Sequence, residues 1–82
     1  MTCDQVFELI VQHTREILPE LQGRTLQRSD RLQDLGANSL DRAEIVMAVL
    51  DSLSLQIPRV ETFGPNNIGA LAELLHAKLH TV

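Results

Sequence analysis

Apolar side chains recur at helical spacing in three stretches of this 82-residue chain, and turn-forming residues separate these stretches. None of the chain alternates apolar and polar residues in the manner of a half-buried strand. The pattern predicts helices over 2–18 and 39–53, a single short turn over 60–63, and a last helix that ends near residue 80. We therefore expect an all-α fold: one domain over 1–82, a bundle of three main helices plus one short helix, with a long first loop.

The first helix and the loop after it have contrasting patterns. Thr2 or Asp4 is suited to cap the helix, and Pro19 ends it. Its apolar face comprises Val6, Ile10, His13 and Ile17, with Phe7 and Leu9 beside it. The segment 19–38 is polar and long for a loop in so small a domain. We expect three leucines to attach it to the core: Leu26, Leu32 and Leu35.

The second helix is predicted to begin after a cap at Asn38 or Ser39. Asp41 and Glu44 in its first turns complement the helix dipole. The Ile57-Pro58 pair excludes a continuation of this helix at that point. Its apolar series comprises Leu40, Ala43, Val46, Met47, Leu50 and Leu53.

The C-terminal part contains a short turn and the last helix. Phe63 is predicted to anchor the short turn against the core, and Gly64-Pro65 ends this turn. Asn66 or Asn67 then caps the last helix. The apolar face of that helix comprises Ile68, Leu71, Leu74, Leu75 and Leu79.

Composition narrows the classes of function. The chain has 11 acidic and 7 basic residues and two Phe as its only aromatics among Phe, Tyr and Trp. The bases are scattered, which argues against nucleic-acid binding and favours a partner with a basic surface. The single Cys3 excludes an internal disulfide and a Cys-based zinc site. No apolar run is long enough to span a membrane and the N-terminus does not resemble a signal peptide. We expect a cytoplasmic monomer with no membrane partner.

Candidate chemistry is sparse. His76 and His80 have the spacing of a metal-binding pair, but no third ligand accompanies them, so we predict no metal. No nucleophile elbow, paired carboxylates or phosphate loop is present, so we predict no catalytic residue and no enzyme. The most informative segment, 35–40, places the Ser39 hydroxyl at the start of a helix, where backbone N–H groups favour a phosphate. A simple cap is the more common role of a serine at such a position.

Three segments together resemble the acyl carrier protein family: Leu35-Gly36-Ala37-Asn38-Ser39-Leu40, Glu44-Ile45-Val46 and Leu55-Gln56-Ile57-Pro58. The resemblance implies that Ser39 bears 4′-phosphopantetheine, which a phosphopantetheinyl transferase attaches from coenzyme A. Gly36 and Asn38 form the motif turn. The family has Asp where this chain has Asn38, so a carboxylate is absent beside the serine that the transferase must recognise.

A narrower resemblance covers 36–45 and the Ile57-Pro58-Arg59 exit. Both are similar to the stand-alone donor carriers of polyketide β-branching cassettes. This similarity implies that an acyl-loading enzyme places an acetyl thioester on the arm and that an HMG-CoA synthase-like enzyme accepts the acetyl group. The alternatives are a general fatty-acid or polyketide carrier, a peptidyl carrier, and a helical module that has lost the cofactor.

A surface stripe on the second helix is the expected partner-binding face. It starts at Ser39 and mixes acids with small or flexible apolar groups: Leu40, Glu44, Met47, Ala48 and Asp51, flanked by Asp41, Arg42 and Ile45. Met47 fits the core and the partner face equally well. Arg42 is unusual on an acidic face, where it either opposes an acid of one partner or is simply solvated.

Overall fold

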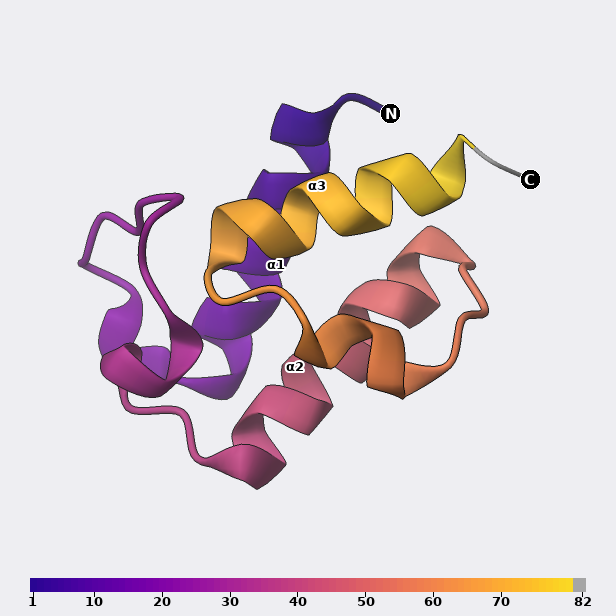
Figure 1. Cartoon of the computed structure of the whole chain (residues 1–82). Helices are drawn as coiled ribbons and strands as arrows, with labels where there is room; N and C mark the ends of the chain where they lie inside the picture. Colours follow the sequence, from indigo (N-terminus) through magenta and orange to yellow (C-terminus); the bar gives the residue numbers. More distant parts are fainter. Residues whose placement is uncertain (81–82) are drawn as a thin grey trace.

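The computed structural model describes residues 1–80, and three α-helices form its framework (Figure 1). They are α1 (Cys3–Ile17), α2 (Ser39–Leu53) and α3 (Ile68–Leu79). Three 3-10 turns lie between them: η1 (Pro19–Leu21), η2 (Leu32–Leu35) and η3 (Arg59–Phe63). α1 packs against both α2 and α3. The described part contains no strand, as predicted, and positions 81–82 of the predicted domain lie outside it.

The predicted short fourth helix is a 3-10 turn of five residues. Pro58 precedes it and Gly64 follows it, and the Glu61 N–H donates to the Pro58 carbonyl at 3.0 Å. So short a segment closes hydrogen bonds to the third preceding residue more readily than those of an α-helix. The described chain therefore has three α-helices and 3-10 turns, and the short turn predicted over 60–63 is present as the 3-10 turn η3.

α1 begins with a capping box, in which Thr2 is the cap. The Thr2 hydroxyl oxygen accepts from the Gln5 N–H, and the Gln5 amide oxygen accepts from the Thr2 N–H. The buried face comprises Val6, Phe7, Ile10, Val11 and Thr14. Ile17 and His13 are half-buried at its edge.

Two polar side chains of α1, which lie at or near the core, have hydrogen-bond partners. The buried Thr14 hydroxyl donates to the Ile10 carbonyl at 2.7 Å, so it is satisfied within the helix. His13 Nε2 lies 2.8 Å from the Ser52 hydroxyl, which connects α1 to the last turn of α2. The His13–Ser52 contact therefore supports the packing of α1 against α2.

The long first loop is attached to the core as predicted. Leu26 and Leu35 are buried and Leu32 is partly buried. The backbone of the loop also pairs with the start of α3: the Ile68 N–H donates to Asp30 and the Gly69 N–H to Arg28, both at 2.9 Å. A Cβ on Gly69 would lie 2.8 Å from the Arg28 Cβ, so only glycine permits this approach.

α2 buries a narrower face than its apolar pattern suggests. Its buried residues are Ile45, Val46, Val49 and Leu50. Leu40 and Met47, which belong both to the apolar series and to the predicted surface stripe, are exposed. Ile45, predicted at the border of the partner stripe, is instead fully buried. Packing against α1 selects these residues, because the helix carries more apolar positions than one neighbour can cover.

α3 follows its predicted pattern closely. Asn67 is the cap, with its side-chain oxygen accepting from the Ala70 N–H at 2.7 Å. Ile68, Leu71 and Leu75 are buried, and Leu74 and Leu79 lie at the edge of the core. None of the helices in residues 1–80 combines the length and the apolar character needed to cross a membrane.

Candidate functional site

The loop reaches α2 through a tight turn at Gly36. Gly36 has φ 101°, and its N–H donates to the Gln33 carbonyl at the end of η2. Left-handed backbone of this kind favours glycine, because any Cβ is strained there. The buried Ala37 follows, and its N–H donates to the Leu32 carbonyl at 3.1 Å. The turn therefore places Asn38 and Ser39 at a defined position beside η2.

Asn38, and not Ser39, caps α2. The Asn38 side-chain oxygen accepts from the Asp41 N–H at 2.8 Å, and the Asp41 carboxylate accepts from the Asn38 N–H at 3.3 Å. This reciprocal pair satisfies two backbone donors of the turn. Ser39 is the first residue of α2 and is exposed. Its hydroxyl is therefore not needed to begin the helix and is accessible to another protein.

The electrostatic setting of Ser39 suits a phosphodiester. The N-terminal turn of α2 carries a positive partial charge and unpaired N–H groups. Arg42, one turn further along the helix, adds a cation near the same end. The Asp41 carboxylate is the opposing charge, but it is engaged in the capping box. A phosphate linked to Ser39 would thus meet the positive end of the helix, with Arg42 as a favourable charge and Asp41 as an opposing charge on the same helix.

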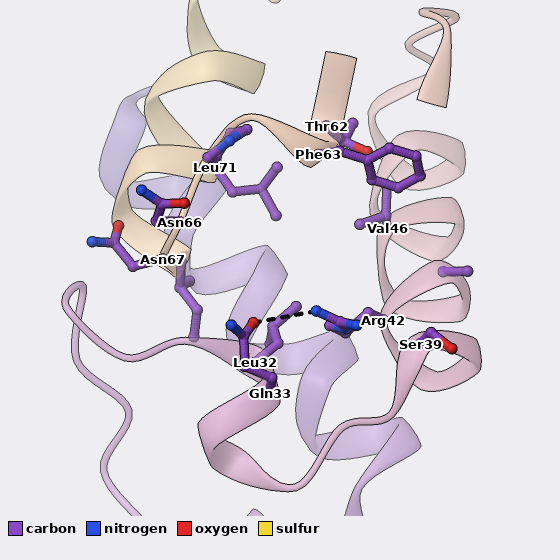
Figure 2. Close-up of a pocket in the computed structure, with 13 residues that line it drawn as sticks. Leu32, Gln33, Ser39, Arg42, Val46, Thr62, Phe63, Asn66, Asn67 and Leu71 are labelled. Carbon is purple, nitrogen blue, oxygen red and sulfur yellow. Dashed lines mark hydrogen bonds between the residues drawn. The ribbon is translucent and has the colours of Figure 1, made fainter. Parts of the chain in front are cut away.

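A pocket of about 410 Å³ lies beside Ser39, between α2, η2, η3 and the beginning of α3 (Figure 2). Its apolar lining comprises Leu32, Ala43, Val46, Phe63, Ile68 and Leu71. The sequence did not predict this pocket. It depends on how η3 and α3 approach α2, and no local pattern reports that approach.

Arg42 extends across this pocket. Its Nη1 donates to the Gln33 side-chain oxygen at 3.2 Å, which joins α2 to η2, and Figure 2 shows the bond as a dashed line. The residue is half-buried. Arg42 is therefore not simply a solvated residue of the surface stripe, because it makes a specific contact within the chain.

The rest of the predicted stripe forms one face of α2. Leu40, Glu44, Met47 and Asp51 are exposed and Ala48 is half-buried. Leu40 is 66% exposed and Met47 is 53% exposed. Large apolar side chains at this exposure, next to carboxylates, are typical of a surface that contacts another protein.

Phe63 does not anchor η3, contrary to the sequence prediction. It is 74% exposed, whereas its neighbour Thr62 is 7% exposed. Because the 3-10 turn orients Thr62 inward, the adjacent Phe63 lies at the rim of the pocket (Figure 2). An ion pair at 2.6 Å between Glu61 and Lys78 connects η3 to α3. The side chain of Arg59 lies outside the described part of the structure.

The two histidines of α3 contact each other. The ring centroids of His76 and His80 are 4.5 Å apart in an edge-to-face arrangement. Within residues 1–80, no three side chains of His, Cys, Asp or Glu gather in a manner that would hold a metal ion.

Comparisons with known proteins fit this geometry. A family model described as a phosphopantetheine attachment site matches residues 8–75. The chain is 47% identical to the polyketide biosynthesis acyl-carrier-protein AcpK of Bacillus subtilis (strain 168), over 99% of each chain. It is 28% identical to an acyl carrier protein of Prochlorococcus marinus (strain MIT 9515), over 95% of this chain and 98% of that one.

A solved structure shares the fold. A chain in the crystal structure of the curacin biosynthetic pathway HMG synthase in complex with acetyl donor-ACP superposes with a TM-score of 0.91. It is 49% identical, and the match covers 94% of this chain and 99% of that chain. The all-α carrier fold and the polyketide carrier resemblance inferred from the sequence are thereby confirmed.

Proposed function

This chain belongs to the acyl carrier proteins, the family with a phosphopantetheine attachment site, and from that membership we propose that it donates an acetyl group in polyketide β-branching. It is a carrier rather than a catalyst. Its partner in this proposal is an HMG-CoA synthase-like enzyme. The observation that carries the proposal is the 49% identity, over nearly the whole chain, to a structure of an HMG synthase with its acetyl donor carrier.

Ser39 is the proposed attachment residue for 4′-phosphopantetheine. It is exposed at the start of α2, and the cap is supplied by Asn38. A phosphopantetheinyl transferase would join the Ser39 hydroxyl oxygen to the phosphopantetheine phosphorus of coenzyme A. The nucleotide part of coenzyme A leaves, and a base of the transferase takes the hydroxyl proton. The field at the helix N-terminus stabilises the phosphodiester that results.

The flexible arm then delivers its cargo. An acyl-loading enzyme places the acetyl group on the thiol of the arm as a thioester. The synthase-like enzyme accepts this acetyl group and adds it to a β-ketoacyl chain held by a second carrier. These steps take place in the cytoplasm. The carrier acts as a monomer, since it must bind and leave several enzymes in turn.

The exposed stripe of α2 is the proposed docking face. Leu40 and Met47 supply apolar contact area, and Glu44 and Asp51 supply negative charge. Apolar contacts at the centre and charges at the rim favour a rapid encounter with a basic groove followed by ready release. Ala48 also belongs to this face, and Asp41 and Arg42 border it. The helix therefore guides the partner toward Ser39 at its N-terminal end.

A general fatty-acid or polyketide carrier is the second candidate. The 28% identity to the acyl carrier protein of Prochlorococcus marinus favours the shared family role. The 49% identity to a chain of the HMG synthase complex with acetyl donor-ACP favours the donor role.

The first experiment measures the intact mass of the protein after co-expression with a broad-specificity phosphopantetheinyl transferase. We expect a gain of one phosphopantetheine group in the natural chain and none in Ser39→Ala. Absence of the gain in both the natural chain and Asn38→Asp would contradict the carrier assignment. A gain in Asn38→Asp alone would show that Asn38 restricts the transferase.

The second experiment tests the donor role. The acetylated carrier is mixed with the HMG synthase of the curacin pathway, and the loss of the acetyl group is followed by mass. We expect acetyl transfer from this carrier to be faster than from an acyl carrier protein of fatty-acid synthesis loaded in the same way. Equal rates would favour the general carrier.

A further inference from the structure

The pocket beside Ser39 is far larger than an acetyl group requires. Its volume is about 410 Å³, and Val46, Ile68 and Leu71 contribute to its apolar lining. A longer acyl chain on the arm would gain from burial there, by a factor of about four for each methylene. An acetyl group has one methyl beyond its carbonyl, so its gain is at most about fourfold.

The contact between Arg42 and Gln33 is part of the lining of the same pocket. The two side chains meet at 3.2 Å and bridge α2 and η2 on the side of the pocket where Ser39 lies (Figure 2). Val46 and Leu71 lie beyond the bridge in this view. A cargo that enters past this bridge competes with a half-buried guanidinium and its hydrogen bond. A side-chain hydrogen bond is worth a factor of about five, which already exceeds the gain from one methyl group.

We propose that the Arg42–Gln33 bridge keeps an acetyl thioester outside the pocket and sets the acyl length at which the pocket fills. The inference rests on the proposed attachment of the arm to Ser39. Acetyl then remains on the surface, where the synthase-like enzyme reaches it. Longer chains withdraw into the pocket, so the bridge is a specificity determinant for short cargo.

The test uses the whole chain, loaded with phosphopantetheine and then with acetyl, propionyl, butyryl or hexanoyl groups. Nuclear magnetic resonance reports the backbone amide shifts of Val46, Ile68 and Leu71 relative to the thiol form. In the natural protein we expect no change with acetyl and a clear change with hexanoyl. In Gln33→Ala the amide shifts should begin to change with an acyl chain one or two carbons shorter. The reason is that the cost of breaking the Arg42–Gln33 hydrogen bond, a factor of about five, is absent.

Two further variants sharpen this test. Gln33 is exposed and lies outside the docking stripe of α2, so its substitution separates cargo length from partner binding. Gln56→Ala is the matched control, since Gln56 is also exposed but does not line the pocket. Arg42→Met, which keeps an unbranched side chain but removes the charge, should also lower the length at which the pocket fills.

Three results would overturn the inference. One is an amide shift at the pocket with acetyl in the natural protein, and another is the same threshold length in Gln33→Ala and the natural protein. The third is an absence of shifts at every length in both proteins. If Ser39 accepts no arm, the mass measurement shows it before any cargo is loaded. Failure of the proposed function is thus distinct from failure of the bridge.

Discussion

α1 and α2 are both fifteen residues long and both begin with a capping box, yet they place their apolar side chains differently. Every apolar residue of α1 is buried or half-buried. α2 buries Ile45 and Val49 completely but leaves Leu40 and Met47 more than half exposed. The two helices thus share their length and their N-terminal hydrogen bonding but differ in how much apolar surface remains in water.

The difference indicates that α1 mainly supports the fold, whereas α2 also presents a surface for contact with another protein. Burial of apolar area stabilises the folded chain at about 25 cal/mol per Å². An exposed leucine or methionine contributes little of this and remains available to a partner. α2 has this freedom because only one of its faces, with Ile45, Val46, Val49 and Leu50, joins the core.

The largest expected effect contrasts two positions on α2. Ile45→Ala should lower the free energy of unfolding by about 2–5 kcal/mol, because it leaves a cavity in the core. Leu40→Ala should change it by less than about 0.5 kcal/mol. Urea denaturation measures both. Should Ile45→Ala fail to fold, Ile45→Val with a cost of about 0.5–1.5 kcal/mol provides the same contrast. Equal costs at the two positions would remove the distinction between the faces.

The next effect concerns binding. Leu40→Ala and Met47→Ala should each weaken the complex of the loaded carrier with the synthase-like enzyme by about 1–2 kcal/mol, or roughly fivefold to thirtyfold. Calorimetric titration gives the dissociation constants. Glu8→Ala, at an exposed position of α1, is the control and should leave binding unchanged. An effect of the α1 variant as large as those of α2 would contradict the assignment of the docking face.

The two caps should contribute equally. Thr2→Ala and Asn38→Ala each remove the side-chain acceptor of a capping box, at a cost of about 1 kcal/mol in unfolding free energy. Ser39→Ala should leave stability nearly unchanged, since Ser39 does not cap α2. Thermal denaturation of the three variants without the cofactor measures these differences. A loss in Ser39→Ala as large as that in Asn38→Ala would show that the serine also supports the helix.

The smallest effect is expected at Phe63. Phe63→Ala should alter stability by less than about 0.5 kcal/mol, because the side chain is 74% exposed. Phe7→Ala is the matched substitution in α1, where the side chain is 9% exposed, and it should cost about 3–5 kcal/mol. Chemical denaturation of both variants compares the two phenylalanines directly. A large cost at Phe63 would restore the anchor role that the sequence suggested.

Local features of the fold were predicted well because they depend on neighbours in the chain. The bounds of α2, 39–53, follow from its cap and from the break before Pro58. Thr2 and Asn67 were identified as possible caps by residue type and position, and both make the expected hydrogen bonds. The attachment of the loop by Leu26 and Leu35 also follows from isolated apolar residues in a polar segment.

Assignments that depend on an inward or outward orientation were less successful. α2 carries two overlapping apolar series, and the sequence does not say which one meets α1. Ile45 was therefore placed at the border of the surface stripe, wrongly, and Leu40 was assigned both to the apolar series and to the stripe, where its exposure fits the stripe. At η3 an aromatic residue beside a threonine suggested a buried ring, but the turn buries Thr62 instead.

By itself, the sequence determined the helices, two candidate caps for each of them and the turn that presents Ser39, because hydrogen bonds within four residues govern these features. Its motif also led to the carrier family. Only the tertiary structure decided which apolar residues of α2 remain exposed and that a pocket opens beside Ser39. The contact of Arg42 with Gln33 likewise joins elements that only packing brings together. These features depend on the relative placement of helices and turns, which the local spacing of residues along the chain does not specify.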